Sequence, residues 1–258
     1  MNWKAGDTVD GVVEVEADSW NGFVSYVQDE LANYRAYIFR GQREPEWQLV
    51  PSIDRIQGLA ALRNDTLSTF KNASRGRRGA SPASLTDDEW WALGQHYGLR
   101  TPLLDWTASP FVAAFFAFLT KRDISALPKA RIVYAIARQQ IAKKKAEIER
   151  DAPGTFLTGT DAIEILSPQV DDNNRLVSQR GYFTKSLGVH IEIEAWIRKW
   201  FRGNTGGIMI KILIMEQDHE RDIFLRFLNR MNINHLSLFP DLDGASRYCN
   251  MELEIEDY

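Results

Sequence analysis

The sequence contains one cysteine, Cys249, in 258 residues. A single thiol cannot form an internal disulfide or supply a multi-cysteine metal site, and this usage is typical of reducing compartments. We therefore expect a cytoplasmic protein. In the absence of a local nucleophile signature, Cys249 is expected to be a small buried side chain.

Long hydrophobic runs are also missing. The longest, Phe111 to Leu119, is too short for a bilayer, which needs about 20 apolar residues. The N-terminal residues lack a basic stretch followed by an apolar run, so no targeting peptide is predicted. The apolar run is expected to be a core helix, and we predict no membrane partner.

The chain has little net charge, with a formal value of −4 at pH 7. It generates no overall basic field, so a nucleic-acid partner would need a local basic patch. The two candidates are Arg75, Arg77 and Arg78 in one stretch, and Arg138 with Lys143 to Lys145 in another. We interpret the first as part of a flexible loop at about 72–84 and the second as the solvated face of a helix.

Common catalytic and cofactor motifs are absent as well. The four histidines are scattered, and no HExxH or CxxC pattern occurs, so we expect no metal site. The sequence also lacks a P-loop, a GxGxxG fingerprint and a GxSxG elbow. The frequent ATP, Rossmann dinucleotide and hydrolase signatures are thereby excluded.

What the chain does have is ordinary globular composition, with 44% hydrophobic residues, and clear secondary-structure patterns. Apolar spacing and capping residues predict helices, given by residue number as 20–33, 63–70, 86–96, 111–120, 143–150, 217–229 and a final one from about 240. Apolar or alternating runs predict strands at 37–39, 131–137, 176–182, 189–194, 207–214 and 233–239. We therefore predict one domain over 1–258 of the α+β or α/β class, a mixed β-sheet with packed helices. The segment 207–239 is expected to include a crossover unit.

Several polar residues lie in apolar or aromatic surroundings. Arg40 follows the strand residues YIF, where it is either a structural ion pair or a bidentate anchor for phosphate or ribose oxygens. Asp105, flanked by leucines and Trp106, must be paired to remain ionised, and Arg100 or a backbone amide is a candidate partner. His96 is expected near a helix end. Glu192 shares one face of its predicted strand with Glu194 and His190.

Three longer segments carry a family resemblance. They are FRGQREPEWQLVPSIDR from Phe39, QHYGLRTPLLDWTASPFVAAFFAF from Gln95 and NRLVSQRGYFT from Asn174, with weaker support from LFPDLDGAS. On these segments the chain resembles the FRG domain family of bacterial and phage proteins.

The order of parts is also similar to that of ADP-ribosyltransferases. Those enzymes have an arginine closing the first strand, a Ser/Thr-bearing strand that leads into a helix, and a Glu or Gln on a later strand. The resemblance assigns these parts to Arg40, to Asp105–Thr107 leading into Ala113 and the residues after it, and to Gln179, Glu192 or Glu194.

This second resemblance implies an NAD-dependent ADP-ribosyltransferase or NAD glycohydrolase, of the toxin or antiphage-defence kind, acting on a macromolecular acceptor. It implies catalytic roles for Arg40, Asp105, Gln179 and Glu192. It further implies that NAD is bound by a set of residues that share these segments: Arg40, Gly41, His96, Tyr97, Trp106, Thr107, Arg175 and Phe183, with Trp106 or Tyr97 stacking on nicotinamide.

Two other functions fit the same residues. One is a non-catalytic nucleotide or nucleic-acid binding module that uses the same pocket only for recognition. The other is a metal-independent nuclease built on His96 and Asp105. The sequence does not predict the acceptor or the oligomeric state.

Overall fold

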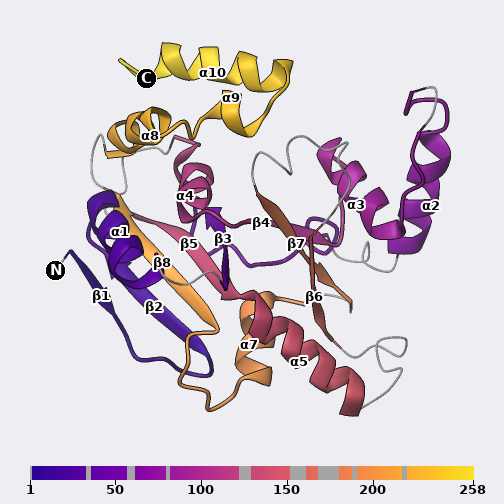
Figure 1. The fold of residues 1–258 in the computed structure, drawn as a ribbon, viewed down its shortest axis with the longest axis horizontal. Helices are drawn as coiled ribbons and strands as arrows, with labels where there is room; N and C mark the ends of the chain where they lie inside the picture. The colour runs from indigo at the N-terminus through magenta and orange to yellow at the C-terminus, as the bar shows by residue number, and fades with distance from the viewer. Residues whose placement is uncertain are drawn as a thin grey trace.

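The computed structural model describes residues 2–32, 36–56, 62–79, 82–121, 129–151, 161–167, 180–187, 191–216 and 220–258. Within these ranges the strands form one eight-stranded sheet in the order β1-β2-β8-β5-β3-β4-β7-β6 (Figure 1). The strands are β1 (Trp3–Ala5), β2 (Val12–Ala17), β3 (Tyr37–Gln42), β4 (Leu103–Thr107), β5 (Lys129–Ala137), β6 (Ile163–Leu166), β7 (Gly181–Ser186) and β8 (Met209–Glu216). Neighbours are antiparallel except β2 and β8, which are parallel. The predicted mixed sheet is confirmed.

Helices cover both faces of this sheet. They are α1 (Trp20–Tyr26) with the π-helical turn η1 (Val27–Leu31), α2 (Arg63–Ala73), α3 (Asp87–His96), α4 (Pro110–Phe118), α5 (Arg138–Asp151), α7 (Ile193–Trp200), α8 (Glu220–Arg230), α9 (His235–Leu238) and α10 (Leu242–Glu254). One hydrophobic cluster joins α1, α4, α8, α9 and α10 to one face, and a second joins α5 and α7 to the other. A third joins α2 and α3 to β4 and β7, at the right of Figure 1. None of the described helices is long and apolar enough to cross a membrane.

Capping residues start the helices on either side of β4. Thr86 and Glu89 form a reciprocal capping box at the start of α3. Ser109 accepts a hydrogen bond from the Val112 N–H at the start of α4, and Pro110 occupies the first turn. Both helix starts are as predicted from the sequence.

Helix α4 lies directly on β3. A Cβ atom on Gly41 would stand 1.8 Å from the carbonyl oxygen of Ala113, so only a residue without a side chain allows this approach. The α4 residues that face the sheet are fully buried, including Ala113, Ala114 and Phe115. The position of α4 relative to β3 is therefore fixed by close backbone contact.

Two buried arginines satisfy the carbonyl groups at the C-terminal end of α4. Arg131 of β5 donates to the Ala117 and Thr120 oxygens, and Arg221 of α8 donates to the Phe118 and Leu119 oxygens. Arg131 is fully buried and also pairs with Glu216 of β8. The last turn of α4 thus obtains its hydrogen-bond donors from the sheet and from α8.

The structure differs from the prediction in several elements. The segment predicted as a strand at 189–194 contains the start of α7, because the Glu192 side chain accepts hydrogen bonds from the Glu194 and Ala195 N–H groups and caps a helix. The segment 233–239 contains α9, which is capped by Asn234, so the crossover predicted over 207–239 is wrong. Strands β1, β2 and β6 were not predicted, and β4 was indicated only through the ADP-ribosyltransferase resemblance.

Other boundaries also shift. Helix α2 continues to Ala73, into the start of the predicted loop at 72–84. The strand predicted at 176–182 is described only from residue 180, and β7 begins at Gly181. Cys249 is exposed, because Met251 provides the buried side chain of this part of α10.

Candidate functional site

Strands β3 and β4 diverge directly after they meet. The two strands pair at Phe39 and Thr107, and no further pair forms between their described residues. On their outer sides, β3 continues along β5 for six residue pairs and β4 along β7 for five. A gap therefore opens within the sheet between the C-terminal half of β3 and the N-terminal half of β4.

Arg40 bridges this gap. Side chains alternate between the two faces of a sheet. The paired residues Phe39 and Thr107 mark one face, which Asp105 shares, whereas Arg40 starts on the opposite face. The guanidinium Nη1 donates to the backbone carbonyl of Asp105 at 2.8 Å and lies 3.9 Å from its carboxylate Oδ2. The arginine thus supplies one hydrogen bond across the gap.

The environment of Arg40 is unusual for a cation. Its side chain is 17% exposed, and its Nε atom is buried without a hydrogen-bond partner among the described residues. Burial lowers the pKa of the guanidinium, and the negative charge of Asp105 acts in the opposite direction. Because this guanidinium is already largely removed from water, its N–H groups can donate to an anionic or oxygen-rich ligand at little further desolvation cost.

Asp105 is held from a second side by Gln95 of α3. The Gln95 Nε2 donates to Asp105 Oδ1 at 2.7 Å, and the Thr101 hydroxyl contacts the Gln95 Oε1. The Asp105 side chain is nevertheless 61% exposed. The partners of this carboxylate are therefore Gln95 and Arg40 rather than Arg100, and the group stays open to the solvent side.

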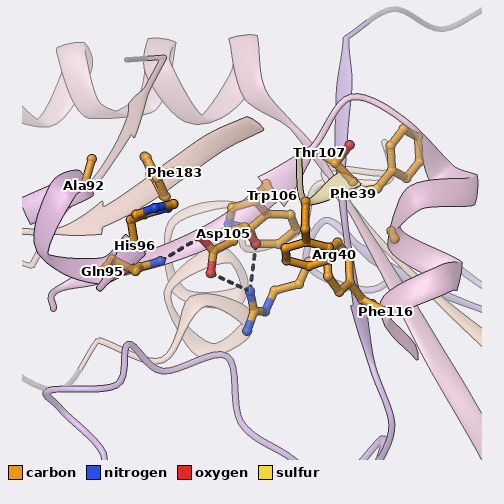
Figure 2. Close-up of a pocket in the computed structure, with 13 residues that line it drawn as sticks. Phe39, Arg40, Ala92, Gln95, His96, Asp105, Trp106, Thr107, Phe116 and Phe183 are labelled. Atoms are coloured by element: carbon orange, nitrogen blue, oxygen red, sulfur yellow. Dashed lines mark hydrogen bonds and ion pairs between the residues drawn. The ribbon is translucent and has the colours of Figure 1, made fainter. Parts of the chain in front are cut away.

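These residues line one pocket with a volume of about 410 Å³ (Figure 2). The gap between β3 and β4 forms its floor, α3 and α4 form two walls, and Phe239 after α9 contributes a third. Most of the lining is aromatic or apolar, and the polar groups are few. The lining residues are Phe39, Arg40, Gly41, Ala92, Gln95, His96, Asp105, Trp106, Thr107, Ala113, Phe116, Phe183 and Phe239.

Most of the site residues predicted from the sequence meet in this pocket. The ones that line it are Arg40, Gly41, His96, Asp105, Trp106, Thr107 and Phe183. Two of them already serve the fold: the Trp106 indole donates to the Thr184 hydroxyl, and the Thr107 hydroxyl accepts from the Ser109 N–H. Trp106 is 3% exposed, so it forms part of the pocket wall and does not project into it.

Other predicted residues lie elsewhere or outside the described ranges. Tyr97 is 74% exposed and does not line the pocket, although its ring contacts that of His96 edge-on. Glu192 caps α7, and Glu194 pairs with Arg198 and Lys211. Gln179 and Arg175 lie outside the residues that the structure describes.

Sequence reasoning missed three residues of the pocket that matter to its chemistry. Gln95 was noted only as the start of a motif, Phe116 lay within the predicted core helix, and Phe239 was the last residue of a predicted strand. One feature of the sequence could have pointed to Gln95: it directly precedes the candidate residue His96, at the C-terminal end of α3. Among the described residues, no group of three or more His, Cys, Asp or Glu side chains could hold a metal ion.

Comparison with known proteins finds a family model that matches part of the chain. Residues 35–125 match the model of the FRG domain. All lining residues except Phe183 and Phe239 lie inside the matched segment. Searches of curated proteins and of solved structures find no match to the chain.

Proposed function

We infer that this chain, whose residues 35–125 match the FRG domain model, binds NAD in the pocket and transfers its ADP-ribose to a macromolecular acceptor. One observation carries the proposal: a guanidinium and an open carboxylate face each other within an aromatic pocket built from segments far apart in the sequence. Aromatic walls with a few convergent polar groups are typical of small-molecule sites.

The pocket residues suit the parts of NAD as substrate. The volume of about 410 Å³ falls in the usual range for ligand pockets, about 300–1,000 Å³, and suits the nicotinamide riboside half of NAD. Phe116 and Phe239, which are partly exposed, offer apolar surface to the planar nicotinamide. Arg40 offers N–H donors to ribose or phosphate oxygens.

Asp105 supports the chemical step. The bond between C1′ of the ribose and N1 of nicotinamide breaks, and its electron pair neutralises the nicotinamide nitrogen. The ribose then carries oxocarbenium-like positive charge, which a nearby carboxylate stabilises. An acceptor nucleophile bonds to C1′, and its proton passes to Asp105 or to water. With water as the acceptor, the same step is NAD hydrolysis.

One observation favours the non-catalytic alternative. Both charged groups of the pocket already have protein partners, since Asp105 accepts from Gln95 and Arg40 donates to the Asp105 carbonyl. A module that only recognises a nucleotide would use the same contacts without releasing nicotinamide. The toxin and antiphage roles implied by the ADP-ribosyltransferase resemblance stay predictions.

The test combines NAD binding by calorimetry, release of nicotinamide, and label transfer from NAD to proteins or nucleic acids of a cell lysate. Asp105→Asn keeps the shape of the side chain and should lower nicotinamide release about 100-fold or more, the scale of losing one charge-stabilising group. Arg40→Met should weaken NAD binding about 10- to 100-fold, the scale of a hydrogen bond to a charged group.

Arg43→Ala is the matched control, because Arg43 follows the same strand and does not line the pocket. Thermal melts of all variants separate loss of folding from loss of function. Binding of NAD without any product would favour the recognition module. The absence of both binding and product in the wild type would reject the NAD proposal altogether.

A further inference from the structure

We propose that Gln95 is a positioning residue that fixes the Asp105 carboxylate in the orientation needed at the pocket. The hydrogen bonds of Gln95 are seen in the structure, whereas their effect on turnover rests on the proposed function. Gln95 was not among the site residues predicted from the sequence. A series of hydrogen bonds leads from a buried anchor, Thr101, through Gln95 to the exposed carboxylate.

This series of hydrogen bonds begins at Thr101, which is fully buried. The Thr101 N–H donates to the Ser52 hydroxyl at 3.0 Å, which ties this residue to the loop after β3. The Thr101 Oγ1 accepts from the Leu103 N–H at 3.3 Å, so its own proton is available to the Gln95 Oε1. The anchor is therefore part of the folded interior.

The orientation of the Gln95 amide follows from this anchor. With its oxygen accepting from Thr101, the amide must present its NH₂ group on the other side, where it donates to Asp105 Oδ1 at 2.7 Å. An ionised carboxylate can only accept hydrogen bonds, so the NH₂ group is the correct partner. A glutamine at this place matches both neighbours, and neither a glutamate nor an apolar residue does.

Asp105 requires such support because it is open to solvent. Its side chain is 61% exposed, and an exposed side chain loses rotamer freedom when it is held in one orientation. Gln95 holds Oδ1, and Oδ2 remains toward Arg40 at 3.9 Å. Figure 2 shows these two contacts approaching the carboxylate from opposite sides. One oxygen is thereby tied to the protein and the other is presented beside the arginine.

The test uses kinetics of nicotinamide release by the full chain with NAD as the probe. Gln95→Ala should lower kcat about 10- to 100-fold, the scale of a lost hydrogen bond to a charged group, while KM changes little because Arg40 and the aromatic walls remain. Thr101→Ser keeps the hydroxyl and should retain activity, whereas Thr101→Val should show the loss.

Gln95→Glu gives a readout that a purely structural role would not produce. Two carboxylates then face each other and retain a shared proton more readily than either does alone. Activity of this variant should recover as the pH falls, opposite to a simple loss of folding. A pH profile parallel to that of the wild type would contradict the proposal.

Asp88→Asn is the matched control, because Asp88 also ties α3 to the sheet, through Lys185 of β7, and does not line the pocket. Equal loss of kcat in Asp88→Asn and Gln95→Ala would mean that Gln95 only docks α3, and would overturn the proposal. If the wild type releases no nicotinamide, the proposed function fails. Crystal structures of the wild type and Gln95→Ala then decide: a rotated Asp105 carboxylate supports positioning, and an unchanged one refutes it.

Discussion

His235 should make the stability of the protein depend on pH through a single buried ring. The residue is 2% exposed at the start of α9, and its ring packs against Phe115 at 5.3 Å and Phe239 at 5.8 Å between centroids. Its Nδ1 has no hydrogen-bond partner among the described residues. Burial lowers the pKa of this imidazole from 6.5 to about 4, with Arg247 acting in the same direction and Asp243 against it.

The sign and size of the effect follow from this shift. Between pH 6.5 and about 4 the unfolded chain binds a proton that the folded chain excludes, so the histidine costs stability as the pH falls through this window. Above pH 6.5 the imidazole is neutral in both the folded and the unfolded chain, so this loss of stability is absent. Because one pKa unit corresponds to about 1.4 kcal/mol, a pKa that falls from 6.5 to about 4 corresponds to roughly 3 kcal/mol of unfolding free energy by pH 4.

The measurement is urea unfolding at several values between pH 4 and 7, for the wild type and His235→Phe. The variant keeps a ring beside Phe115 and Phe239 but cannot titrate, and all other ionisable groups are common to both proteins. The difference in unfolding free energy should change by roughly 3 kcal/mol over this range in favour of the variant at low pH. Parallel stability curves would refute the reasoning.

Two substitutions test the packing of α4. Gly41→Ala should destabilise the fold by about 3 kcal/mol or more in urea unfolding, because the added Cβ meets the Ala113 carbonyl, while Gly6→Ala, with only ordinary contacts, should be close to neutral. Arg131→Met should cost about 3–5 kcal/mol, because it leaves Glu216 buried without its partner. A second change, Glu216→Gln, should recover part of that loss, and additive losses in the double variant would contradict this account of the ion pair.

Local signals in the sequence were sufficient for many elements of the fold. Thr86 and Ser109 predicted the starts of α3 and α4, because a capping side chain needs only residues two or three positions away. The same rule explains an error. The alternation of HIEIE was interpreted as a strand, but Glu192 caps a helix in which Ile193, Trp196 and Ile197 recur at helical spacing and are buried.

The two charged residues of the site could be predicted from the sequence, but their geometry could not. Arg40 and Asp105 stood out as charged side chains in apolar surroundings, which is a local observation. Their meeting depends on the pairing of β3 with β4 and on its end after one residue pair, which no short sequence window contains. Gln95 was missed for the same reason, since its partner Asp105 lies beyond the turn that ends α3.

The gap between β3 and β4 also affects how the protein would respond to an occupied pocket. A continuous sheet is stiffened by its ladder of backbone bonds. Among the strand residues that the structure describes, β3 and β4, which join the two parts of this sheet, are linked by one residue pair and by the Arg40 side chain. Any molecule that contacts both strands adds links across this joint. Ligand affinity and sheet rigidity are therefore thermodynamically linked, and a bound ligand would slow amide exchange in strands it never touches.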